Sequence, residues 1–204
     1  MHLYGLIIGI AFIIGFNYFS KHQKNLSEKQ LNIFFGGIIL FSLIGARVYH
    51  VIDQWSYYSQ HLLLIPATWN GGLGIFGGIF GALIFIFLFS RFIQVSSFSL
   101  LDSISPIMPL CQAIGRIGNF VNHEINFWWI EASLDLILFF IIKFFPNKPT
   151  AKYLIGYGLI RFFFEFFRAD TWVINQIKIG QIISVLFIIL GFVLICSNYN
   201  KTKK

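Results

Sequence analysis

Charged residues are scarce in this sequence of 204 residues. They make up 11% of the chain, with only 8 Asp and Glu, whereas 57% of the residues are hydrophobic and 26 are Phe. One soluble core of this length could not bury so much apolar surface. The scarcity of charge therefore excludes an ordinary soluble globular protein and predicts a protein of the lipid bilayer.

Cysteine is also scarce, since the chain has only Cys111 and Cys196, both in apolar runs and without C-x-x-C spacing. This pattern excludes a disulfide framework and a cysteine-based metal site, so we expect no bound metal. The formal net charge is +7, but the basic residues are scattered between apolar runs. We attribute them to membrane topology and expect no nucleic acid partner.

Long hydrophobic runs are the main feature of the sequence. A membrane-spanning helix needs roughly 20 mostly apolar residues. The first run begins at Leu3 without a basic segment before it, so we expect it to be retained as a helix and not removed as a signal peptide. The runs predict an all-α, polytopic membrane protein, with one transmembrane domain over residues 1–204. Its seven expected transmembrane helices are 3–20, 31–52, 72–90, 100–115, 126–145, 153–167 and 182–197.

The fourth and sixth of these spans are short, and an even helix count would follow if one of them did not cross. Orientation follows from Lys and Arg, which are enriched in cytoplasmic loops. With the N-terminus outside, only Arg116, Arg168 and Lys178 fall in outer segments. Ten basic residues then fall inside, namely Lys21, Lys24, Lys29, Arg91, Lys143, Lys148, Lys152, Lys201, Lys203 and Lys204. We therefore expect the N-terminus outside, the C-terminus inside and the polar segments at the outer face.

The sixth span contains the segment YGLIRFFFEFFRAD. It places Tyr157, Arg161, Glu165 and Arg168 at spacings of four, four and three, which form one stripe of a helix. Charged residues within a span are costly and typically face a bundle interior or a wet cavity. The stripe is either functional or a structural Arg161–Glu165 pair that locks helices together. Arg168 favours function, because a single pair would not need it.

The segment GRIGNFVNHE, residues 115–124, concentrates polar side chains after the fourth span. Gly115 and Gly118 weaken a regular helix there, so its amides could approach a ligand. Arg116 and Arg161 come from different spans and could converge on one anion. Because a planar guanidinium suits phosphate, we expect a phospholipid headgroup as the ligand. A turn whose Asn side chains satisfy backbone groups is the alternative, and both interpretations could hold together.

Glycines at GxxxG spacing mark the third span, in WNGGLGIFGGIFGAL. The pairs Gly74/Gly78 and Gly77/Gly81 favour close packing of helix backbones. Gly77 and Gly78 are also candidate substrate-binding positions, because a loop-like entry at residues 71–72 could line a lipid-accessible cleft.

Three other charged residues stand near helix ends. We interpret Asp102 and Glu131 as orienting or capping groups. Arg47 ends the second span and could reach the outer interface by snorkelling.

Taken together, these segments resemble the prolipoprotein diacylglyceryl transferase family, bacterial membrane enzymes that begin lipoprotein maturation. GRIGNFVNHE resembles the family pattern G-R-x-G-N-F-x-N-x-E, and YGLIRFFFEFFR resembles its pattern Y-G-x-x-R-F-x-x-E-F-x-R. LYGLIIGIAF, GARVYHVI and WNGGLGIFGG resemble three earlier segments in the same order. The resemblance therefore extends over nearly the whole chain.

The resemblance implies transfer of the diacylglyceryl group of phosphatidylglycerol to the thiol of a lipobox cysteine, with release of glycerol 1-phosphate. Its implied partners are phosphatidylglycerol, a preprolipoprotein lipobox peptide and the lipid bilayer, without any cofactor. The implied location is the bacterial cytoplasmic (inner) membrane, with a multi-pass chain and an active site toward the outer face. By position, the resemblance implies an active site lined by Arg116, Asn119, Glu124, Arg161, Glu165 and Arg168, with Tyr4 and Asn122 nearby. Of these we expect Arg116, Arg161, Glu124 and Glu165 to be catalytic, and Tyr4, Asn119, Asn122 and Arg168 to bind the substrate.

The chain departs from the family pattern at several points. It has Phe76 where the family usually has His or Tyr, and His123 where the family usually has Gly. We therefore hypothesise that His123 is a catalytic base that replaces the function missing at Phe76. The alternative is a phospholipid-binding paralogue on the same membrane fold that is non-catalytic or uses another acceptor. Paired acids inside the bilayer favour the enzyme over mere lipid binding, and paired broken helices typical of a transporter are lacking.

Overall fold

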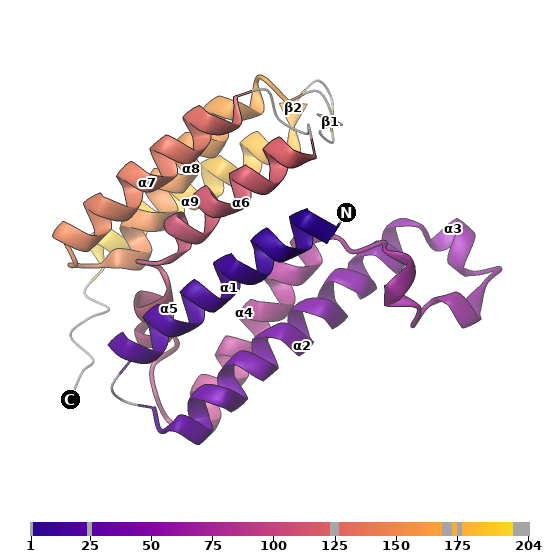
Figure 1. The fold of residues 1–204 in the computed structure, drawn as a ribbon, viewed down its shortest axis with the longest axis horizontal. Coiled ribbons are helices and arrows are strands. Elements are labelled where there is room, and N and C mark those ends of the chain that lie inside the picture. The colour runs from indigo at the N-terminus through magenta and orange to yellow at the C-terminus, as the bar shows by residue number, and fades with distance from the viewer. Residues whose placement is uncertain (1, 24–25, 123–126, 169–172, 175–176, 198–204) are drawn as a thin grey trace. The chain divides into compact units, whose positions relative to one another are not determined.

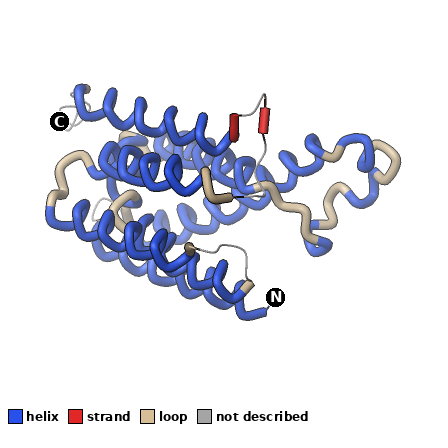
Figure 2. Tube along the Cα trace, turned by 90° about the horizontal axis from the view of Figure 1, so that it is seen from above, coloured by secondary structure: helices blue, strands red, loops and turns tan. Residues whose placement is uncertain are grey.

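The computed structural model describes residues 2–23, 26–122, 127–168, 173–174 and 177–197. Helices dominate these residues, and Figure 2 shows only one short pair of strands among them. This pair, β1 (Val173–Ile174) and β2 (Ile177–Lys178), is antiparallel, with Val173 opposite Lys178. The all-α prediction is confirmed. The chain divides into two compact units, one of Met1–Gln23 with Leu101–Lys204 and one of Lys24–Leu100. The single domain over residues 1–204 stays a prediction.

The unit of Lys24–Leu100 is built on two long helices that pack against each other. Its elements are α2 (Glu28–Asp53), α3 (Trp55–Tyr58), η1 (Leu62–Leu64), η2 (Thr68–Asn70), α4 (Ile75–Phe92) and the beginning of α5 (Ser97–Ile104). A Cβ added at Gly77 would lie 2.8 Å from the carbonyl carbon of Gly45, and one at Gly81 would lie 2.9 Å from that of Phe41. Only glycine allows so close an approach, so the predicted packing role of the GxxxG spacing is confirmed.

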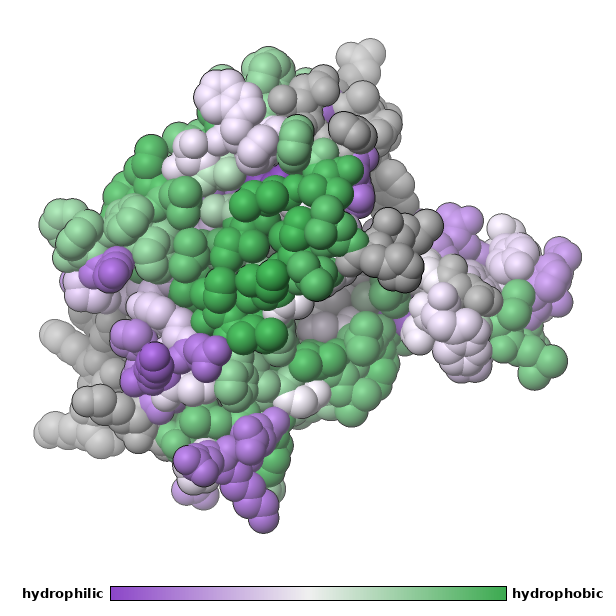
Figure 3. Space-filling view, in the orientation of Figure 1, coloured by the Kyte–Doolittle hydropathy of each residue, from purple (hydrophilic) through white to green (hydrophobic). Residues whose placement is uncertain are grey.

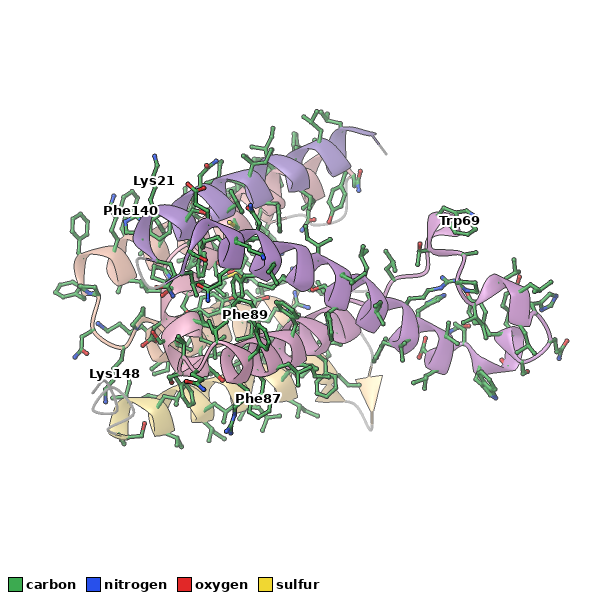
Figure 4. The ribbon with its side chains drawn as sticks, turned by 90° about the horizontal axis from the view of Figure 1, so that it is seen from below. Lys21, Trp69, Phe87, Phe89, Phe140 and Lys148 are labelled. Atoms are coloured by element: carbon green, nitrogen blue, oxygen red, sulfur yellow. The ribbon has the colours of Figure 1, made fainter. Side chains whose placement is uncertain are left out.

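A segment of short helices, residues 54–74, extends beyond α2 in Figure 4, with Trp69 on it. Arg47 of α2 holds this segment, because its guanidinium lies 5.1 Å from the Tyr58 ring centroid and donates to backbone carbonyls. The accepting residues are Leu64, Ile65, Gly71 and Gly72, at 2.6 to 3.1 Å. Arg47 is only 6% exposed. The expectation that it snorkels to the interface is wrong, since its buried guanidinium donates to protein carbonyls.

The other unit is a helical bundle. Its helices are α1 (His2–His22), the end of α5, α6 (Met108–Val121), α7 (Trp128–Phe144), α8 (Pro149–Glu165) and α9 (Ile179–Cys196). Helix α1 packs on α6, and α6, α7, α8 and α9 pack each on the next (Figure 1). Successive helices from α6 to α9 alternate in direction, so the C-terminal ends of α6 and α8 lie beside the N-terminal ends of α7 and α9.

The expected fourth span, 100–115, is not one helix. Helix α5 ends at Ile104 and α6 begins at Met108, with a turn between them. Pro106 lies in that turn, and proline removes a backbone donor and disfavours helix at the residue before it.

Asp102 of α5 links this region to α8. Its Oδ1 accepts from Thr150 Oγ1 at 2.6 Å and from the Thr150 backbone N–H at 3.3 Å, in the first turn of α8. An acceptor there satisfies a free amide of the helix N-terminus. The prediction that Asp102 orients or caps is confirmed.

Four of the described helices are long and apolar enough to cross a membrane, namely α1 (over Leu3–His22), α2, α4 and α9. Helices α7 and α8 have 17 residues each, the lower end of the usual range for a span. Large apolar side chains on the long helices are exposed, and in Figure 3 apolar residues cover wide parts of the drawn surface. The chain is a membrane protein. The count of seven spans and the orientation stay predictions.

Candidate active site

Arg116 lies in the second half of α6, which continues as a regular helix through Gly115 and Gly118 to Val121. The expectation that these glycines weaken the helix is therefore wrong. The structure explains the glycine at position 118 differently. A Cβ added there would lie 2.8 Å from Cδ2 of Tyr4, so a side chain would collide with the tyrosine ring. Tyr4 is half-buried, and its ring packs on the α6 backbone. The first turn of α1 thus lies against the part of α6 that carries Arg116.

Two carboxylates of α7 lie beside Arg116. Its Nε is 3.0 Å from Oε2 of Glu131 and 3.7 Å from Oδ2 of Asp135. Glu131 and Asp135 are 1% and 0% exposed, and the Arg116 side chain is 11% exposed. Among the described residues, neither oxygen of Asp135 has a hydrogen-bond partner, and the contact between Nε and Glu131 lacks hydrogen-bond alignment. These are ion pairs in a region of low water content, where charge interactions are strong.

Arg168 approaches the same carboxylate from beyond α8. Its Nη2 donates to Glu131 Oε2 at 3.1 Å and to Oε1 at 3.3 Å. Helix α8 ends at Glu165, so the predicted helical stripe holds for Tyr157, Arg161 and Glu165 but not for Arg168. The chain after α8 is held by Lys178, whose Nζ donates to the backbone carbonyls of Glu165 and Arg168 at 2.8 and 2.5 Å.

Arg161 and Glu165 form an ion pair one helical turn apart, with 2.9 Å between Nη2 and Oε2. Glu165 is 1% exposed, whereas the Arg161 side chain is 23% exposed. The predicted pair is therefore present. It leaves the guanidinium of Arg161 partly accessible at the same end of the bundle as Arg116.

Three guanidinium groups share this region. Burial lowers the pKa of Arg168, and the positive charges of Arg161 and, more weakly, of Arg116 lower it further, whereas Glu131 raises it. Arg116 and Arg168 also contact the same carboxylate, that of Glu131. A further anion among them would relieve their repulsion, and a guanidinium fork is well suited to a phosphate oxygen pair.

Polar side chains continue from this cluster into the bundle. Gln112, one turn before Arg116 on α6, donates from Nε2 to the hydroxyl of Tyr153 at 2.9 Å. Tyr153 stacks on Tyr157, with 5.7 Å between ring centroids. Sequence reasoning had missed Gln112 and Asp135. The available signal was spacing, because Asp135 follows Glu131 by four residues and Gln112 precedes Arg116 by four.

The remaining sequence-predicted residues fall in three places. Asn119 is half-buried on α6, and Asn122 is exposed directly after it. Gly77 and Gly78 lie on α4 of the other unit, where Gly77 packs on α2. His123 and Glu124 lie outside the described residues. In the part of the chain that the structure describes, no three His, Cys, Asp or Glu side chains are grouped as metal ligands would be.

Comparison with known proteins decides the family. The family model described as prolipoprotein diacylglyceryl transferase matches residues 1–197. The chain belongs to the prolipoprotein diacylglyceryl transferase family. The resemblance inferred from its motifs is confirmed.

Similar proteins share this name over nearly their whole length. The chain is 32% identical to the phosphatidylglycerol-prolipoprotein diacylglyceryl transferase of Clostridium novyi, over 98% of this chain and 92% of that protein. It is 32% identical to the enzyme of the same name from Finegoldia magna (94% and 88% covered) and 31% identical to that from Streptococcus uberis (96% and 90% covered). These names match the reaction implied by the motifs and do not favour a non-catalytic paralogue.

Proposed function

We propose that this chain is a phosphatidylglycerol:prolipoprotein diacylglyceryl transferase of the bacterial inner membrane. It transfers the diacylglyceryl group of phosphatidylglycerol to the thiol of a lipobox cysteine and releases glycerol 1-phosphate. The observation that carries the proposal is the convergence of Arg116, Arg161 and Arg168 within a membrane protein of this family.

The reaction requires the arginine cluster to stabilise a negative charge that develops on the phosphate. The thiolate sulfur attacks the diacylglycerol carbon that bears the phosphate, a C–S bond forms, and the electrons of the C–O bond leave with the phosphate. The phosphodiester monoanion thus becomes a phosphomonoester with a second negative charge. Preorganised guanidinium groups stabilise charge that develops in a water-poor site. We assign this role to Arg116 and Arg161.

The other groups would support these two arginines or bind the substrate. Glu165 would orient Arg161, with which it is paired at 2.9 Å. A free thiol has a pKa of about 8.5, so a base or positive charge must favour the thiolate. Glu124 or His123 would accept its proton. We assign substrate binding to Tyr4, Asn119, Asn122 and Arg168, whereas substrate binding by Gly77 and Gly78, which belong to the other unit, stays a prediction.

The active site would face the outer side of the membrane. Lys21, Lys143 and Lys148 lie at the other end of the same unit, at the C-terminal ends of α1 and α7 and before α8. Figure 4 shows Lys21 and Lys148 at that end. Since cytoplasmic ends are enriched in lysine, the arginine cluster would be external, with the N-terminus outside and the C-terminus inside.

The purified protein tests this proposal in phosphatidylglycerol vesicles with a synthetic lipobox peptide. The expected result is a peptide mass increased by one diacylglyceryl group on cysteine. A peptide with Ser in place of Cys and vesicles of phosphatidylcholine are the controls. A folded protein that binds phosphatidylglycerol selectively but forms no product would instead be the phospholipid-binding paralogue.

A further inference from the structure

Glu131 occupies a distinctive place in the cluster, because one carboxylate contacts two arginines from different parts of the bundle. Arg116 reaches it from α6, and Arg168 reaches it from the chain after α8. Glu131 is in the first turn of α7, where a negative charge is favoured by the helix dipole. The Glu131 side chain is 1% exposed, so its negative charge is balanced by these two arginines and not by solvent.

The contact geometry indicates which part of Arg116 is held. Within the described residues, both ion-pair contacts of Arg116 involve Nε, the inner nitrogen of the guanidinium. The two acids therefore contact the inner edge of the guanidinium group. Asp135 is the more distant acid, at 3.7 Å against 3.0 Å for Glu131, and the ion pair of Arg168 is with Glu131. Glu131 is thus the group that couples the two arginines.

We propose that Glu131 is a positioning residue for diacylglyceryl transfer, which holds Arg116 and Arg168 so that their free guanidinium nitrogens face the phosphate of the lipid. This inference rests on the proposed function. Glu131 acts through the arginines and is not itself a catalytic residue, because its oxygens face guanidinium groups and its side chain is buried.

A purely structural role for Glu131 is the competing explanation, since removing one member of a buried ion pair also destabilises a fold. The two explanations predict different catalytic rates for the folded molecules of a Glu131 variant. A positioning role lowers the rate of the folded enzyme, whereas a structural role lowers only the amount of folded enzyme. Asp102→Asn is the matched control, because Asp102 also joins two helices of this unit but binds Thr150, at the opposite end of α8 from Arg161.

The experiment measures kcat and KM for phosphatidylglycerol, per folded protein, in the parent, Glu131→Gln, Glu131→Asp and Asp102→Asn. Misplacing a catalytic group by about 1 Å costs on the order of 10²-fold in rate. We expect Glu131→Gln to lower kcat by about that factor, Glu131→Asp to fall between it and the parent, and Asp102→Asn to keep the parent kcat even if its melting temperature falls. Parent-like kcat in folded Glu131→Gln would overturn the proposal.

A second arm tests whether Glu131 acts through Arg116. In the Arg116→Lys background, adding Glu131→Gln should lower kcat by a smaller factor than it does in the parent, because one of the two arginines that Glu131 positions is already lost. If the loss in the double variant instead equals the product of the two single losses, Glu131 acts independently of Arg116, and the proposal that it positions Arg116 is overturned.

Failure of the proposed function gives a different result. If the parent forms no product, diacylglyceryl transfer itself is wrong, and binding then tests the positioning of the arginines. The readout is the rise in melting temperature of detergent-solubilised protein with phosphatidylglycerol relative to phosphatidylcholine. Glu131→Gln should lose most of this rise and Asp102→Asn should keep it. An equal rise in both variants would refute the role of Glu131.

Discussion

The carboxylate of Glu165 occupies the space beside Gly180 that a side chain there would fill. A Cβ added at Gly180, in the first turn of α9, would lie 2.7 Å from Glu165 Oε2 and nearer still to Oε1. Real Cβ atoms do not approach an oxygen so closely. The glycine therefore makes room for the acid that pairs with Arg161.

Gly180→Ala should displace Glu165 and weaken its ion pair with Arg161. We expect transfer activity per folded protein to fall by about 10-fold or more, because the orientation of a catalytic group is lost. Gly9→Ala is the control, since Gly9 has no atom within 4 Å of an added Cβ and alanine favours a helix. Equal activity of the two variants would show that the Glu165 position does not matter to turnover.

Gly77→Ala and Gly78→Ala separate helix packing from substrate binding. A Cβ at Gly77 overlaps the α2 backbone, whereas one at Gly78 has an ordinary contact of 3.5 Å with the carbonyl of Ser42. We expect Gly77→Ala to cost about 1–3 kcal/mol of stability, as overpacking does. Gly78→Ala should leave the melting temperature nearly unchanged. A loss of activity in Gly78→Ala without any loss of stability would support the predicted substrate contact, and equal stability losses would contradict the packing account.

Arg47→Met should loosen the segment 54–74 that Arg47 holds. Hydrogen bonds from a charged donor contribute about 1.5–3 kcal/mol each, and Arg47 donates to four carbonyls. We expect faster amide hydrogen exchange and protease cleavage within residues 62–74. Arg91→Met is the control, because exposed Arg91 packs on Phe87 of its own helix. Identical exchange of this segment in both variants would argue against the role of Arg47.

The helical fold and the arginine cluster could be predicted from the sequence. Apolar runs of span length identify membrane helices because the bilayer fixes their length. Arg116, Arg161 and Glu165 stand out because charge within such runs is costly. The Arg161–Glu165 pair follows from helical spacing alone.

Features that depend on tertiary neighbours could not be predicted in the same way. The sequence does not show that Arg47 would meet the carbonyls of a later loop, or that one carboxylate, Glu131, would bind arginines 15 residues before it and 37 residues after it. Gly118 suggested a weakened helix, but its lack of a side chain serves contact with Tyr4. In each case, the deciding partner lies far away in the sequence.

Membrane orientation can be tested with single cysteines placed at Ser59 and at Asn147, after Cys111 and Cys196 are replaced by Ala. Both positions are exposed in the structure. With the N-terminus outside, an impermeant thiol reagent should label the cysteine at position 59 in intact cells and the one at position 147 only after lysis. The reverse pattern would overturn the orientation and with it the external active site.

The central claim is that Arg116 and Arg161 bind the phosphate through planar guanidinium groups. Its most direct test is the single-turnover rate of diacylglyceryl transfer by Arg116→Lys and Arg161→Lys, compared with the parent at equal folded concentrations. A lysine keeps the charge but not the fork, so we predict a loss on the order of 10²-fold for each variant. Near-parent rates in both folded lysine variants would contradict the claim.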